Sequence, residues 1–371
     1  MIEFLKHKKF WLPLVILSAL LLMIEGMLRA GWYDRMLSPL SHMGNTVTRL
    51  NAFERFGLKR IHWVTLGDSK MDWGIDHGQL RDARAERDIN HLRLSLAGSN
   101  FLATHTAAEW SIDHLPELQG IMLGLYEHEF VNLGNTQKEF KITWPFKDYW
   151  QFDTFDYFRN ASDNDIWLNQ MALQNYAGDI KDWVLNPLKR HRQHQHHANK
   201  WSEVLDYSRA MSGDLCAHDL SSLASCINSA SQFKNLSQVP HEFVPAYKNC
   251  SNRRAKARLK KQQWHPVSID LQPHAEKWRY LFDRILQADK QLTLLLLPEN
   301  EFFEYMVKPS NIDELVDALL LEYLDHPNFQ LIDLRELFAA ERQCQFYYDT
   351  LHFNNEGIQR VTEALIEALN P

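Results

Sequence analysis

The chain has 371 residues, of which 45% are hydrophobic, so it can bury the core of one large domain with an elaboration. Its formal net charge of −7 argues against a general nucleic-acid-binding protein, although basic residues gather in two short runs. We therefore expect a folded protein that binds no nucleic acid.

The first thirty residues have the pattern of a membrane anchor. Lysines precede an apolar stretch, residues 10–24, which continues past Glu25 to Leu28. A basic start followed by an apolar stretch is also typical of a cleaved signal peptide. No clear small-x-small cleavage site follows, and the basic flank matches a positive-inside orientation. We therefore favour residues 1–30 as an uncleaved signal-anchor over a cleaved signal and over a buried soluble helix.

Beyond a predicted stem over residues 31–60, apolar runs alternate with amphipathic helices. The runs predict five strands, at residues 61–66, 92–96, 121–125, 291–297 and 329–334. The consecutive leucines of the fourth run are typical of a strand that is buried on both faces. Apolar residues at helical spacing predict helices around 278–285, over 312–324 and through 358–369. This alternation predicts a three-layer α/β domain with a mostly parallel five-stranded sheet.

Residues 131–273 do not fit this alternation. The segment is too long for a plain loop, so we interpret it as an inserted, largely helical cap. It contains an aromatic cluster at residues 144–158 and a run of lysine, arginine, histidine and glutamine at 189–197. A metal site in that run would lack carboxylate or cysteine ligands, so we favour a solvated, mobile loop. A second basic run, residues 253–261, is typical of a solvated helix face, with contact to anionic lipid or glycan as the alternative.

The cysteines are compatible with an oxidising compartment. The chain has Cys216, Cys226, Cys250 and Cys344, an even number with three alternative pairings. Cys216 and Cys226 are close enough in sequence to close a short loop outside the cytoplasm. Unpaired thiols are the alternative, whereas a zinc site is disfavoured because no compact Cys/His spacing occurs.

Two short motifs together predict acyl chemistry. Gly67-Asp68-Ser69 directly follows the first predicted strand, and Asp349-Thr350-Leu351-His352 precedes the last predicted helix. A serine hydroxyl needs a base to become a nucleophile, which His352 can supply while Asp349 orients the imidazole. The alternatives are a common turn tripeptide and an ordinary helix start. We favour the triad, because both motifs occur in a chain that we expect to be exported and because sites form outside the carboxyl ends of parallel strands.

These motifs resemble the SGNH (GDSL) hydrolase superfamily, whose last block also often has an asparagine and a glycine after the histidine, as in residues 353–357 here. The resemblance implies an SGNH-like, flavodoxin-like catalytic domain formed by residues 61–130 and 274–371, without a metal or organic cofactor. With its N-terminal anchor, the chain looks like the bacterial envelope branch, which includes alginate O-acetyltransferase-like proteins and the D-alanine transfer proteins of teichoic acid. Such relatives imply a periplasmic domain on the inner membrane that acts on an envelope polymer, often beside a multipass membrane acyltransferase.

The resemblance also implies an oxyanion hole, and here the sequence departs from the family. The backbone N–H groups of Ser69 and Gly98 would surround the oxyanion. The third block normally adds an asparagine, but the third strand runs into Tyr126-Glu127-His128, and we expect Asn100 to substitute. Loss of one such donor costs on the order of 10²–10³ in rate, so the departure bears on hydrolysis more than on the fold.

Three neighbouring polar residues are interpreted more simply. Glu127 and His128 are expected to be polar residues at a strand end. For Lys70, pairing with a carboxylate, approach to an anionic substrate and exposure to solvent remain alternatives.

We therefore expect an anchored serine O-acyltransferase that acts on acyl, in the first place acetyl, esters of an envelope polysaccharide. An esterase with the same triad is the first alternative. The second is a non-catalytic, glycan-binding or scaffolding pseudoenzyme that partners a multipass acyltransferase.

Overall fold

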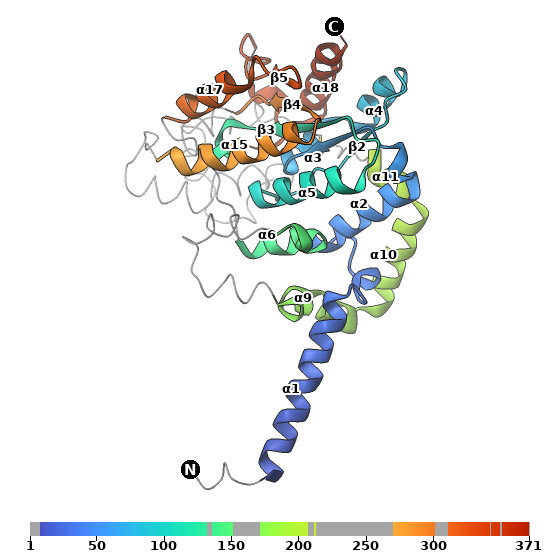
Figure 1. The fold of residues 1–371 in the computed structure, drawn as a ribbon. Helices are drawn as coiled ribbons and strands as arrows, with labels where there is room; N and C mark the ends of the chain where they lie inside the picture. Colours follow the sequence, from blue (N-terminus) through green and yellow to red (C-terminus); the bar gives the residue numbers. More distant parts are fainter. Residues whose placement is uncertain are drawn as a thin grey trace, which may run out of the picture.

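The computed structural model describes residues 8–131, 136–150, 171–206, 211–212, 270–300, 311–341, 343–348 and 351–370. At its centre lies a five-stranded, all-parallel sheet with the order β2-β1-β3-β4-β5 (Figure 1). The strands are β1 (Trp63–Leu66), β2 (His91–Arg93), β3 (Gly120–Leu125), β4 (Gln291–Leu296) and β5 (Phe329–Asp333). Each overlaps one of the five apolar runs, although β2 shares only residues 92 and 93 with its run, so the predicted α/β fold with a parallel sheet is confirmed.

Helices cover both faces of the sheet. One face packs against α5 (Phe101–His114), α15 (Gln272–Gln287) and α17 (Ile312–Tyr323) in the larger hydrophobic cluster. The other face packs against α3 (Ser69–Gly74), α4 (His77–Ala85) and α18 (Asn355–Leu369). Alternate residues of β4 point to opposite layers, since Leu294 belongs to the first cluster and Leu295 to the second. The run of leucines is therefore buried on both faces, as predicted.

The segment expected to be a stem, residues 31–60, contains a helix that packs on the domain. It comprises η2 (Asp34–Met36), α2 (His42–Phe56) and η3 (Leu58–Arg60). Ser41 caps α2 by accepting a hydrogen bond from the Gly44 N–H at 3.0 Å. Phe53 of this helix packs in the larger hydrophobic cluster, and the Arg49 side chain of the same helix is also buried. This segment is thus part of the folded domain as well as the link to the anchor.

The described part of the predicted insertion is helical. After η4 (Glu127–Val131) it comprises α6 (Thr136–Thr143), η5 (Trp144–Tyr149), α9 (Ala172–Leu185), α10 (Pro187–Asn199) and α11 (Trp201–Asp206). The expected loop at 189–197 is wrong, because these residues belong to α10, which begins with Pro187 and buries Arg190. The Arg190 guanidinium pairs with the Asp179 carboxylate of α9, which fixes α10 against α9.

Several sequence predictions fall outside the described residues. They concern the basic run at 253–261, the far part of the aromatic cluster and three of the four cysteines. Cys344 is described: it lies buried in η9 (Gln343–Phe346) and is disulfide-bonded.

The predicted anchor forms a single long helix, α1 (Lys8–Arg29), which projects from the domain and is almost entirely exposed along its apolar length (Figure 1). Among the described residues it is the one helix that is long and apolar enough to cross a membrane.

Candidate active site

Ser69 lies at the carboxyl end of β1, as the first residue of α3. The turn between them requires Gly67, whose φ is +148°, because a Cβ there would lie 2.6 Å from the Gly124 carbonyl oxygen. Asp68 caps the helix by accepting a hydrogen bond from the Lys70 N–H at 2.7 Å. The strand, the glycine turn and the cap together place the Ser69 hydroxyl on the rim where parallel sheets form their sites.

The structure brings Ser69 and His352 together across 283 positions of sequence. The Ser69 Oγ and the His352 Nε2 are 3.2 Å apart, which is within reach for proton transfer. The indole ring of Trp73 lies 4.7 Å from the imidazole, centroid to centroid, and supports its position. Asp349 lies outside the described residues, so its predicted role as the orienting carboxylate stays a prediction.

A cavity of about 320 Å³ opens at these two side chains. Gly98 also lines it, so three of the predicted site residues share one space. The other walls come from the α2 region, from α6, from the loop after β2 and from Trp73 of α3 (Leu40, Ser41, His42, Asn45, Thr46, Trp73, Leu96, Ala97, Lys138 and Ile142). The supposed stem and the first helix of the insertion therefore build half of the candidate site.

Lys138 is a cavity residue that sequence reasoning missed. Gly98 has a φ of +80°, and a Cβ placed on it would overlap the Nζ and Cε of Lys138. The ammonium group therefore lies directly against the glycine that was predicted to contribute to the oxyanion hole. Among the described residues that line this cavity, Lys138 is the one with a permanent charge, and none is a carboxylate.

Asn100, the predicted substitute donor, is the N-cap residue of α5. It is not among the residues that line the cavity. Its backbone N–H, together with that of Ala103, contacts the buried carboxyl group of Glu139. Burial raises the pKa of Glu139 to about 8, although both N–H groups oppose the shift. The structure therefore gives Asn100 a role at the start of α5, whereas its proposed role as an oxyanion donor stays a prediction.

Two carboxyl groups, the partly buried Asp68 and the buried Glu129, lie next to each other beside the serine. Burial, and after it the neighbouring Asp68 carboxylate, raises the pKa of Glu129 well above its ordinary range. Burial also opposes ionisation of Asp68, but the Lys70 ammonium and a hydrogen bond from Glu129 lower its pKa. The pair therefore favours ionisation of Asp68 over ionisation of Glu129, and the neighbouring His352 side chain also lowers the pKa of Asp68.

Lys70 is held inside this cluster. Its Nζ lies 3.9 Å from carboxylate oxygens of both Asp68 and Glu129, and 4.3 Å from the centre of the Tyr126 ring. Of the three alternatives for Lys70, pairing with a carboxylate is the one found in the structure. Glu127, the first residue of η4, forms an ion pair with Arg335.

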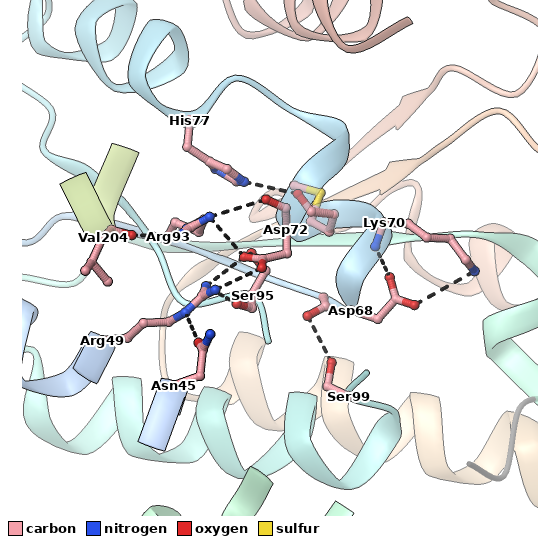
Figure 2. A network of polar contacts seen from close by, with 12 residues as sticks. Asn45, Arg49, Asp68, Lys70, Asp72, His77, Arg93, Ser95, Ser99 and Val204 are labelled. Carbon is pink, nitrogen blue, oxygen red and sulfur yellow. Dashed lines mark hydrogen bonds and ion pairs between the residues drawn. The ribbon is translucent and has the colours of Figure 1, made fainter. Parts of the chain in front are cut away.

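A second buried network, shown in Figure 2, fixes the helix that begins with the serine. Arg49 of α2 contacts both carboxylate oxygens of Asp72 in α3, at 2.7 and 2.9 Å. Arg93 of β2 lies 3.2 Å from the same carboxylate, and the Ser95 hydroxyl donates to it at 3.1 Å. Two arginines outweigh burial and lower the pKa of Asp72. Side chains from α2 and β2 therefore hold α3, the helix that begins with Ser69.

Among the described residues, no group of three or more histidine, cysteine, aspartate or glutamate side chains is arranged to hold a metal ion. No protein-family model matches this chain, and no curated protein sequence matches it.

Proposed function

We propose that the chain is a serine-dependent O-acyltransferase of the SGNH type that acts on acyl esters of a cell-envelope polysaccharide. The observation that carries the proposal is the 3.2 Å contact between the Ser69 Oγ and the His352 Nε2, at the carboxyl edge of a parallel sheet and in a cavity. A nucleophile beside a base, with room for a substrate, is the arrangement that acyl transfer needs.

The proposed reaction begins when the Ser69 Oγ attacks the acyl carbonyl carbon while the His352 Nε2 accepts the hydroxyl proton. The carbonyl oxygen becomes an oxyanion, which the backbone N–H groups of Ser69 and Gly98 would stabilise. The tetrahedral adduct then expels the donor alcohol, which takes the proton back from His352. Asp349 would orient the imidazole, and the Asp68 carboxylate would further favour the transient imidazolium, since the charges of Asp68 and His352 interact.

The Lys138 ammonium would take the place of the asparagine that the SGNH family normally has after the third strand and that this chain lacks. It lies against Gly98 in a cavity lined by no carboxylate among the described residues. A positive charge in a partly enclosed site stabilises a developing oxyanion more strongly than it would in water. The altered third block is then compatible with catalysis.

The location is part of the proposal. We propose that α1 crosses the bacterial inner membrane once and that the domain lies in the periplasm. The disulfide at Cys344 supports an oxidising compartment. The acyl group would reach Ser69 from a donor ester or from a multipass acyltransferase. His352 would then take the proton of a sugar hydroxyl while the sugar oxygen attacks the acyl carbon, and the Ser69 Oγ would leave and recover that proton.

An assay of the full chain in detergent tests this proposal. The acyl donor is 4-nitrophenyl acetate, the acceptors are short uronate and N-acetylglucosamine oligosaccharides, and mass spectrometry detects acetylated products. Ser69→Ala should abolish both 4-nitrophenol release and glycan acetylation, whereas Ser202→Ala, at an exposed serine of α11, should change neither. Equal release by the wild type and Ser69→Ala would contradict the assignment of the nucleophile.

The same assay separates the alternatives. An esterase would release 4-nitrophenol without acetylating any oligosaccharide. A pseudoenzyme, which the missing asparagine favours, would release no more 4-nitrophenol than Ser69→Ala does.

A further inference from the structure

The corner between α9 and α10 exposes an apolar patch. Trp183 is 38% exposed, Val184 62%, Leu185 66% and Leu188 73%. These large side chains occupy consecutive or nearly consecutive positions at the end of one helix and the start of the next. Single exposed apolar residues need no explanation, but a contiguous group of this size indicates a surface that is covered in the functional state.

The position of α9 indicates what covers the patch. The Glu25 carboxylate, near the domain end of α1, accepts hydrogen bonds from the Ala172 and Leu173 N–H groups at 2.7 and 2.8 Å. Leu28 of α1 packs in one cluster with Ala172 and Tyr176 of α9. Figure 1 shows α9 beside the domain end of α1, below the sheet and the helices that cover it. A bilayer around α1 would therefore adjoin α9.

The charges near the patch suit a lipid headgroup layer. Lys181, Lys189 and Arg192 are exposed on the two helices. The nearby acidic side chains of Asp179 and Asp182 both pair with the buried Arg190, which offsets one of their two negative charges. Apolar side chains flanked by exposed lysine and arginine, with a tryptophan among them, are typical of helices that lie in a membrane interface.

We propose that the α9–α10 corner is a second membrane-binding element, in which Trp183, Val184, Leu185 and Leu188 enter the boundary between headgroups and acyl chains. Lys181 and Lys189 contact lipid phosphates there. The proposal rests on α1 crossing the bilayer and is independent of the catalytic assignment. The corner would bind the leaflet from which α1 emerges, because α1 holds the start of α9 beside that leaflet.

The element would also set the height of the candidate site. From the corner, α10 has 13 residues, and at 1.5 Å per residue it extends about 20 Å. Its last turn carries His196 and His197, which line a second cavity of about 320 Å³. This cavity shares Asn45, Trp73 and Ala97 with the cavity at Ser69. With both α1 and the corner in the membrane, the site would open at a fixed distance from the bilayer surface.

Quenching of tryptophan fluorescence by brominated acyl chains tests this proposal in the full chain. The protein is reconstituted into nanodiscs of phosphatidylcholine and phosphatidylglycerol, with or without bromine on the acyl chains. Trp183→Phe should remove a part of the quenched fluorescence, whereas Trp201→Phe, at a partly buried residue of α11, should not. Trp11→Phe should also remove a part, which establishes that α1 is inserted.

A double variant, Val184→Glu with Leu185→Glu, keeps Trp183 but should lose the same part of the quenching, because charged side chains withdraw the corner from the acyl chains. Both side chains are exposed, so the fold should persist. Equal quenching of the wild type, Trp183→Phe and the double variant would overturn the proposal and would favour a protein partner as the ligand of the patch. Equal quenching of the wild type and Trp11→Phe would overturn its premise.

Discussion

Replacing Arg49 by methionine tests whether α2 holds α3, the helix that begins with Ser69, in place. The Arg49 and Asp72 side chains are each 2% exposed, and the guanidinium contacts both carboxylate oxygens. It also donates to the Asn45 side-chain oxygen at 2.8 Å and to the Ser95 carbonyl oxygen. Breaking a buried ion pair by removing one partner costs about 3–5 kcal/mol. Arg93 and Ser95 still contact Asp72 in this variant, so we expect about 3 kcal/mol.

The expected change in melting temperature follows from the size of the chain. An unfolding entropy of about 2.1 cal/mol/K per residue gives roughly 0.8 kcal/mol/K for 371 residues. Arg49→Met should therefore lower the melting temperature by about 4 °C. Asp72→Asn leaves Arg49 and Arg93 facing each other without a carboxylate, so it should cost about 5 kcal/mol and lower the melting temperature by about 6 °C.

The assay is a thermal melt of the detergent-solubilised full chain, followed by intrinsic tryptophan fluorescence. Arg55→Met, at an exposed arginine of the same helix, is the control and should shift the melting temperature by less than about 1 °C. The expected order of destabilisation is Asp72→Asn, then Arg49→Met, then Arg55→Met. If Arg49→Met melts together with Arg55→Met, α2 does not hold α3 through this ion pair and the reasoning is refuted.

Three further predictions concern the cavity and its surroundings. Lys138→Met should lower kcat on the order of 10²-fold with little change in KM, and Lys138→Arg should recover part of the loss; an increase in KM alone would assign Lys138 to substrate binding. Gly98→Ala should cost about 1–2 kcal/mol through its positive φ and reduce activity further by displacing Lys138, measured by thermal melts and kinetics; unchanged activity would contradict this. Burial raises the pKa of Glu139 from 4.5 to about 8, so its stabilising contribution is full below pH 4.5 and is lost as the pH rises through 8. The melting temperature of Glu139→Gln should therefore rise relative to that of the wild type between those pH values. If the melting temperatures of the two proteins change with pH in the same way, ionisation of Glu139 does not control stability.

Much of the fold was predictable because a parallel sheet is encoded in local patterns. Strands that are buried on both faces read as short apolar runs, and helices that cover them show apolar residues at helical spacing. The meeting of Ser69 with His352 was expected from the rule that sites form at the carboxyl edge. These features depend on the type of each residue and little on distant partners.

The remaining features depend on contacts that a sequence does not reveal. The sequence does not show that α2 packs on the domain, because its buried face includes Arg49, whose charge is compensated by Asp72 of a different helix. The polar run at 189–197 indicates a loop, but it forms a helix because Arg190 is buried against Asp179 and because Pro187 begins α10. Lys138 belongs to a segment without a recognisable motif, so only its position against Gly98 identifies it.

The most direct test of the central claim is covalent labelling of Ser69 by a fluorophosphonate. The Ser69 Oγ should attack phosphorus and displace fluoride, while His352 accepts the hydroxyl proton. Peptide mass spectrometry of the full chain should place the label on Ser69, and labelling should be lost in Ser69→Ala and strongly slowed in His352→Ala. Labelling of other serines at the same rate as Ser69, or a rate at Ser69 unchanged by His352→Ala, would contradict the catalytic role of the pair.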